Sequence, residues 1–97
     1  MLIWFGSDFI LNFKMRWVDY IVLALENLDG RAPYKDIYNE VEKLRVRDKQ
    51  TLPRTWKDNV RGRIEEHSKV VDGYIPGNPD LFYPAEGKGK GIWALTH

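Results

Sequence analysis

The 97-residue chain contains no cysteine, which excludes a disulfide framework and any metal site built on thiolates. It has only two histidines, one of them the last residue, so there is no histidine-rich set of metal ligands. No serine, histidine and acidic residue are grouped as in a catalytic triad. The sequence therefore predicts no catalytic residue, no metal and no cofactor. The lack of cysteine also fits a reducing compartment, and we expect a cytoplasmic protein.

A long uninterrupted apolar run is also missing. The first fourteen residues, MLIWFGSDFILNFK, are apolar but too short and too broken to cross a membrane. The interrupting residues are Gly6, Ser7, Asp8 and Asn12. The segment lacks the basic start and the small-residue cleavage site of a signal peptide, and Met15 is an alternative start. We expect no membrane contact, and we interpret residues 1–14 as an appendage that adds to the core or binds a second copy or a nuclease partner.

Apolar and aromatic residues are plentiful. The hydrophobic content is 43%, the aromatic content is 13%, and there are four tryptophans, each able to bury a large apolar area. A chain of this length forms one modest core rather than two. The predicted organisation is therefore the appendage of residues 1–14 followed by one domain over residues 15–97.

The chain has almost no net charge, because its 15 lysines and arginines are balanced by 14 acidic residues to a formal total of +1. The total therefore predicts no nucleic-acid binding. The distribution is uneven, however. Residues 43–63 contain eight basic residues and two acidic ones, a net charge of +6.

Helical spacing of apolar residues predicts two helices in the first half of the domain. The segment MRWVDYIVLALENLDG has this spacing and ends in Gly30, which favours a stop. A second helix is expected from about Tyr34 to about Arg45, with Pro33 in the first turn, where proline is tolerated. The apolar face of the second helix is Ile37, Val41 and Leu44.

The segment LPRTWKDNVRGRIEEH, residues 52–67, predicts a third helix opened by Thr51 or Pro53. Trp56, Val60 and Ile64 lie within about 80° of one another on a helical wheel, so we expect them to form the buried face. Basic and short polar groups on the opposite side and its flanks suit the phosphates and base edges of a DNA major groove. The candidate DNA-binding residues are Arg54, Thr55, Lys57, Asp58, Arg61 and Gly62. The alternative is a solvated helix face without a partner.

Turn dipeptides fill the segment SKVVDGYIPGNPD, residues 68–80, and predict a loop. Two short strands are then expected in DLFYPAE and GIWALTH, on either side of the glycine-rich tip EGKGKG. Lys88 and Lys90 at this tip are further candidate DNA-binding residues, because the glycines allow a thin, positively charged loop to lie beside a minor groove. The alternative is an ordinary hairpin turn with solvated lysines. A nucleotide phosphate loop is excluded, since a strand and not a helix follows the glycines.

Two other features favour structure over chemistry. Asp80 after a proline, followed by Glu86 and Lys88, spells the letters of a PD-(D/E)xK nuclease motif. The two acids would have to share a metal ion, but both lie on one short hairpin without the larger sheet that holds such a site. His67 lies near the apolar edge of the third helix, where we expect a structural histidine rather than a ligand or base.

The order helix, helix, helix, hairpin is an α+β arrangement, mainly α with a small antiparallel hairpin. From about Met15 to His97 it resembles a winged helix-turn-helix domain, with residues 52–64 in the position of the recognition helix and residues 87–91 at the tip of the wing. LPRTW together with DLFYPAEGKGKGIWAL is similar to winged helix modules joined to nucleases in bacterial modification-dependent restriction enzymes, including those that respond to N6-methyladenine. No nuclease domain accompanies the module here, so only the reading function carries over.

This resemblance implies binding of double-stranded DNA, methylated on adenine, through the third helix in the major groove and the glycine-lysine wing. Such a module would serve restriction-modification or regulation without catalysis of its own. Two alternatives remain open. The chain is a conventional transcription regulator, or it is a winged helix that binds protein and no DNA, because a fold does not determine a function.

Overall fold

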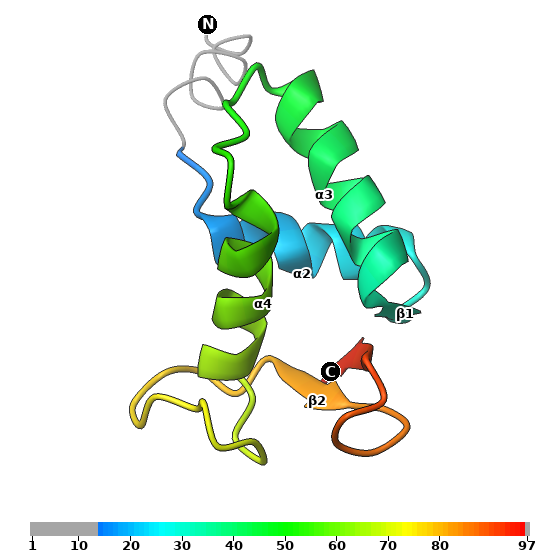
Figure 1. The fold of residues 1–97 in the computed structure, drawn as a ribbon, viewed down its shortest axis with the longest axis vertical. Helices are drawn as coiled ribbons and strands as arrows, with labels where there is room; N and C mark the ends of the chain where they lie inside the picture. Colours follow the sequence, from blue (N-terminus) through cyan, green and yellow to red (C-terminus); the bar gives the residue numbers. More distant parts are fainter. Residues whose placement is uncertain (1–13, 97) are drawn as a thin grey trace, which may run out of the picture.

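The structure of the protein, a computed structural model, describes residues 14–96. The helices and strands in chain order are α2 (Trp17–Asn27), β1 (Arg31–Pro33), α3 (Tyr34–Arg47), α4 (Trp56–Glu66), β2 (Phe82–Pro84) and β3 (Ile92–Leu95). The strands form one antiparallel sheet in the order β1-β3-β2. Three helices and a small antiparallel sheet confirm the predicted α+β class (Figure 1). The predicted role of residues 1–14 as an appendage falls outside the described residues, except for Lys14.

The core forms where α3 and α4 pack against α2, which runs crosswise between them in Figure 1. Every helix and the sheet contribute side chains to it, and burial of one large aliphatic side chain contributes about 1.5–3 kcal/mol. Its largest fully buried side chains are Ile21, Leu25, Ile37, Val41, Val60, Ile64 and Phe82. No helix within residues 14–96 is long and apolar enough to cross a membrane.

β1 is a strand that the sequence analysis missed, so the prediction of a two-stranded hairpin alone is wrong. The expected place of Pro33 in a first helical turn is wrong as well, because Pro33 ends β1 and is the N-cap residue of α3. Only Ala32 is buried among the three residues of β1. So short a pattern is not recognisable as a strand. The strand forms because Arg31 to Pro33 pair with β3, far along the chain.

α4 begins at Trp56, later than the predicted start at Pro53 or before. Residues 54–55 form a turn in which the Trp56 N–H donates to the Pro53 carbonyl, 2.9 Å away. Val60 and Ile64 are fully buried, as predicted. Trp56 packs against the core but is only partly buried, so the prediction that it belongs to the buried face is wrong in part. At the first residue of the helix its ring packs at the rim of the core rather than inside it.

The connection between α3 and α4 is held by a buried arginine. The Arg45 guanidinium lies 3.7 Å from the centre of the Trp17 ring, and its Nε and Nη2 donate to the Thr51 carbonyl at 3.0 and 2.6 Å. Nearby, the Tyr20 hydroxyl donates to Asp48 at 2.8 Å. A desolvated cation on an aromatic face contributes about 2 kcal/mol. These contacts join the connection to α2.

The predicted loop and hairpin follow α4. Residues 68–81 form turns and irregular structure, as expected. His67 is buried, and its Nδ1 lies 3.1 Å from the Pro79 carbonyl, which confirms a structural histidine. The hairpin tip turns through Gly87, Gly89 and Gly91, whose φ angles of 100°, 82° and 74° are unfavourable for other residues.

Candidate nucleic-acid interface

The candidate residues of the third helix lie at the start and along the solvent side of α4. Arg54 and Thr55 are exposed in the turn before the helix, and Thr55 is its N-cap residue. The Thr55 side chain makes no capping hydrogen bond, which leaves its hydroxyl available to another partner. Lys57, Asp58 and Arg61 are exposed on the helix itself. Lys57 and Asp58 lie in the first turn of α4, where a helix has N–H groups without intrahelical partners and a partial positive charge, both of which favour an anion.

Two features of this side leave room for a ligand. The Arg61 Nη2 lies 3.4 Å from Asp58 Oδ1, in a pair whose side chains are 52% and 70% exposed. Ion pairs of this kind contribute little, so a phosphate or a base edge can replace Asp58 as the partner of Arg61. A Cβ atom added at Gly62 would meet no heavy atom within 4 Å. The outer surface of α4 is therefore open at this point.

The basic block of residues 43–63 offers fewer available cations than its formal charge of +6 implies. Arg45 is buried with 6% of its surface exposed. Four other basic residues lie in ion pairs: Lys43 with Glu40, Arg47 with Asp48, Arg61 with Asp58, and Arg63 with Glu66. Within residues 14–96, no ion pair involves Lys49, Arg54 or Lys57. Two of these three stand at the start of α4.

A row of four aromatic rings runs from the start of α4 along α3 to the sheet, and the sequence analysis did not find it. Trp56 meets Tyr38 edge-on with ring centres 5.9 Å apart, Tyr38 stacks on Tyr34 at 5.7 Å, and Tyr34 meets Trp93 at 6.2 Å. The Lys57 ammonium lies 5.5 Å from the centre of the Tyr38 ring. The spacing of Tyr34 and Tyr38, one helical turn apart in α3, was the only signal in the sequence.

The hairpin and the second half of α4 border one hollow of about 270 Å³, lined in part by Glu65, Asp72, Lys88 and Trp93. The candidate residue Lys88 therefore lies close to α4, but it shares this hollow with two carboxylates. Burial raises the pKa of Tyr34, whose ring meets Trp93, to about 12. The hollow thus has groups of both charges and is no simple phosphate site.

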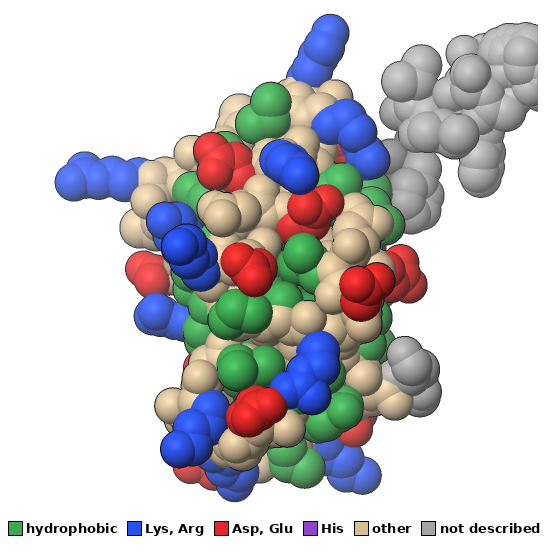
Figure 2. Space-filling view, turned by 90° about the vertical axis from the view of Figure 1, so that its right-hand side faces the viewer, with side chains coloured by type: hydrophobic (Ala, Val, Ile, Leu, Met, Phe, Trp, Pro, Cys, Tyr) green, Lys and Arg blue, Asp and Glu red, His purple; other side chains and the backbone are tan. Residues whose placement is uncertain are grey.

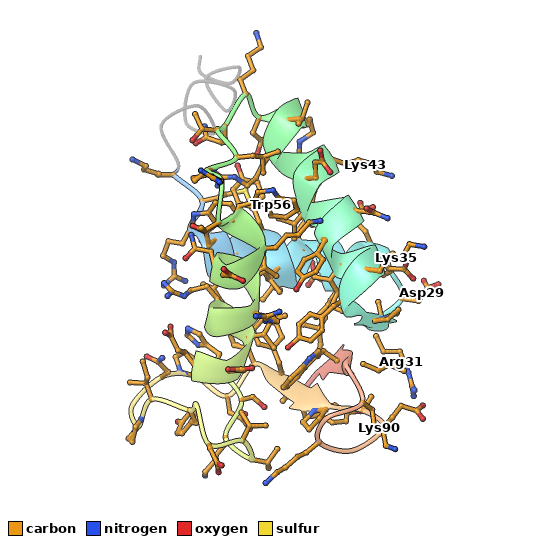
Figure 3. All side chains as sticks on the ribbon, viewed as in Figure 1. Asp29, Arg31, Lys35, Lys43, Trp56 and Lys90 are labelled. Atoms are coloured by element: carbon orange, nitrogen blue, oxygen red, sulfur yellow. The ribbon has the colours of Figure 1, made fainter. Side chains whose placement is uncertain are left out.

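Lys88 and Lys90 are exposed at the tip of the hairpin. At the base of the hairpin Arg31 of β1 pairs with Glu86, a contact that the sequence analysis missed because it joins distant parts of the chain. Figure 3 shows Arg31 and Lys90 pointing away from the body of the molecule on the same edge as Lys35. Figure 2 faces this edge and shows basic side chains interspersed with acidic ones. The edge is therefore charged but not uniformly positive.

The residues of the nuclease-like motif have separate structural partners. Asp80 Oδ1 accepts a hydrogen bond from the Lys69 N–H at 2.8 Å, and Glu86 is paired with Arg31. In the part of the chain that the structure describes, no three His, Cys, Asp or Glu side chains are placed to hold a metal ion. Nothing in this geometry brings Asp80 and Glu86 to a shared ion.

Comparisons of the chain with protein-family models, with curated proteins and with solved structures find no match.

Proposed function

We propose that the chain is a winged helix-turn-helix module that binds duplex DNA and performs no catalysis of its own. In this proposal α3 and α4 are the helix-turn-helix, and β2 and β3 with their connection are the wing. The order of the elements and the central place of β3 in the sheet support it. The observation that carries it is the exposure of Arg54 and Lys57, without ion-pair partners in residues 14–96, at the start of α4. In a helix-turn-helix the residues that contact base edges lie at this end of the second helix.

The remaining candidates then have distinct roles. Arg61, held only by an exposed ion pair, is free to exchange Asp58 for a guanine edge or a phosphate. Asp58 would accept a hydrogen bond from a cytosine amine. Gly62 leaves space for close approach of the DNA. Lys88 and Lys90 would contact phosphates beside the groove and position the module without reading sequence.

The modification that this surface would read is N6-methyladenine. The methyl group projects into the major groove from an amine that keeps one proton for base pairing. The apolar contact for such a group would come from the partly exposed ring of Trp56 and from the methyl group of Thr55. One buried methyl contributes about 0.8 kcal/mol, which corresponds to roughly fourfold discrimination.

A restriction system and a transcription regulator would use the same contacts, and only the resemblance of LPRTW and GKGKGIWAL to modification-reading modules favours the first. Homodimerisation or a nuclease partner would then act through residues 1–14.

A second candidate function is docking to a protein. Glu65 and Asp72 lie beside Lys88, and Glu86 neutralises Arg31, an arrangement that suits a partner with both charges better than a phosphate backbone. The two candidates differ in salt dependence. DNA binding weakens steeply with salt because each neutralised phosphate releases counterions, whereas a mixed interface responds little.

The test is a titration of the full chain with fluorescently labelled duplexes of identical sequence, with and without N6-methyladenine, at several salt concentrations. We expect saturable binding that weakens linearly on a log–log plot, with the methylated duplex bound about fourfold more tightly. Equal affinity for both duplexes would remove the modification-reading part. Absence of binding at low salt would contradict the DNA-binding proposal itself.

A further inference from the structure

A second hollow lies on the flank of α4 away from the aromatic row. Its volume is about 640 Å³, within the range of about 300–1,000 Å³ of small-molecule sites. The start of α2, the end of α3, the connection to α4, the end of α4 and the loop before β2 all contribute to its wall. Representative lining residues are Lys14, Trp17, Arg45, Gln50, Arg63 and Ile75.

The wall of this hollow is positively charged. Its lysine and arginine residues are Lys14, Arg16, Arg45 and Arg63, against the single carboxylate of Glu66, and His67 also lines it. That carboxylate is engaged by Arg63, with 3.1 Å between Nε and Oε1. Arg16 is paired, at 3.1 Å, with Asp19, which does not line the hollow. Two cations therefore remain without a carboxylate partner among residues 14–96, namely Lys14 and Arg45.

Arg45 is the deepest of these groups, with 6% of its surface exposed. Its Nε and Nη2 donate to the Thr51 carbonyl, while Nη1 makes no hydrogen bond to any residue of the described range. Loss of water lowers the pKa of Arg45, although the guanidinium stays charged at neutral pH. A buried cation with an unused donor is stabilised by an anion that reaches it.

We propose that this hollow binds a small organic anion, with its acidic group on Arg45 and Lys14 and its apolar body against Met15, Val18 and Ile75. Charge complementarity selects the acidic group, and the apolar part of the wall selects an organic body over an inorganic ion. This site is independent of the DNA-binding proposal. It lies on the opposite flank of α4 from Lys57 and contains none of the candidate DNA-binding residues.

The test uses two fluorescent probes of nearly the same shape, 8-anilinonaphthalene-1-sulfonate and its neutral analogue N-phenyl-1-naphthylamine, titrated into the full chain without DNA. We expect saturable 1:1 binding of the sulfonate and binding of the neutral probe that is weaker by about tenfold, the effect of one charge-assisted hydrogen bond. Equal affinity for both probes, or binding without saturation, would overturn the proposal.

Variants locate the site. Lys14→Gln changes an exposed side chain and should weaken sulfonate binding by about three- to tenfold. Lys35→Gln removes the same charge from an exposed position outside the hollow and should leave binding unchanged. Arg45→Met should abolish binding, and near-UV circular dichroism shows whether that variant keeps its fold. If it unfolds, Lys14→Gln alone decides. Unchanged sulfonate affinity in Lys14→Gln would contradict the proposal. This outcome does not depend on how the variant binds DNA, so the two proposals can fail separately.

Discussion

Arg45 and Arg54 belong to the same basic block, yet the fold gives them opposite surroundings. Arg45 is buried against Trp17 and donates to the Thr51 carbonyl, whereas Arg54 is exposed in the turn before α4. One cation stabilises the connection between two helices, and the other is available to a partner. The formal charge of a segment therefore overstates the charge that a ligand meets, because the count does not distinguish buried or paired side chains from available ones.

The largest effect is expected from Arg45→Met. This change removes the cation from the Trp17 ring and leaves the Thr51 carbonyl without its donors, so we expect a loss of about 3 kcal/mol in the free energy of unfolding. Urea denaturation measures it. Arg54→Met is the matched control and should change stability by less than about 0.5 kcal/mol. Similar losses in both variants would erase the contrast between the two arginines.

Trp56→Ala tests the rim of the core. Because Trp56 is only partly buried, we expect a loss of about 2 kcal/mol, less than the 3–5 kcal/mol typical of a buried tryptophan. The variant should remain folded and lose its preference for methylated DNA. Trp56→Phe keeps an aromatic ring and should retain most of both properties. Complete unfolding of the alanine variant would show that Trp56 belongs to the core after all.

Arg61→Ala addresses the outer face of α4. Loss of a base contact should weaken DNA binding by about 1.5 kcal/mol and relax sequence preference, whereas loss of a phosphate contact should lower affinity for all sequences alike. Arg63→Ala is the matched control on the same helix, because Arg63 is engaged by Glu66 on the other flank. Anisotropy titrations with two unrelated duplexes separate these outcomes, and an Arg61→Ala variant with wild-type affinity would remove Arg61 from the interface.

The hairpin should show the smallest effect. Replacing Lys88 and Lys90 together by glutamine should lower the slope of log affinity against log salt by about one to two units, because one or two phosphate contacts are lost. The sequence preference should stay unchanged. Glu86→Gln should act in the opposite direction, because it releases Arg31 for a phosphate. A change of preferred sequence without a change in salt dependence would contradict a purely positioning role.

The same contrast explains how far the sequence could predict the structure. Val60 and Ile64 follow the helical period, so the buried face of α4 was predictable, and the glycines of the hairpin tip marked its turn. The strand β1 was not predictable, because its three residues form a strand only by pairing with β3. The start of α4 was placed too early, since Pro53 is followed by a turn, closed by the Trp56 N–H on the Pro53 carbonyl, and not by the first turn of the helix.

The candidate site was predictable in composition but not in arrangement. Periodicity placed Lys57 and Arg61 on the outside of α4, where they are exposed. It could not show that Arg45 is buried, that Glu86 meets Arg31, or that four aromatic rings line up between α4 and the sheet. Each of these depends on contacts between residues far apart in the chain, which no local pattern encodes.

The measurement that tests the central claim most directly is the salt dependence of DNA binding in two double variants with the same net charge. Arg54→Gln with Lys57→Gln removes the two cations without ion-pair partners in residues 14–96 at the start of α4, and Lys35→Gln with Lys43→Gln removes two exposed cations from α3. We expect the slope of log affinity against log salt to fall by about 1.8 in the first variant and to stay unchanged in the second. Equal slopes in the two variants would contradict the claim that the start of α4 is the surface that binds DNA.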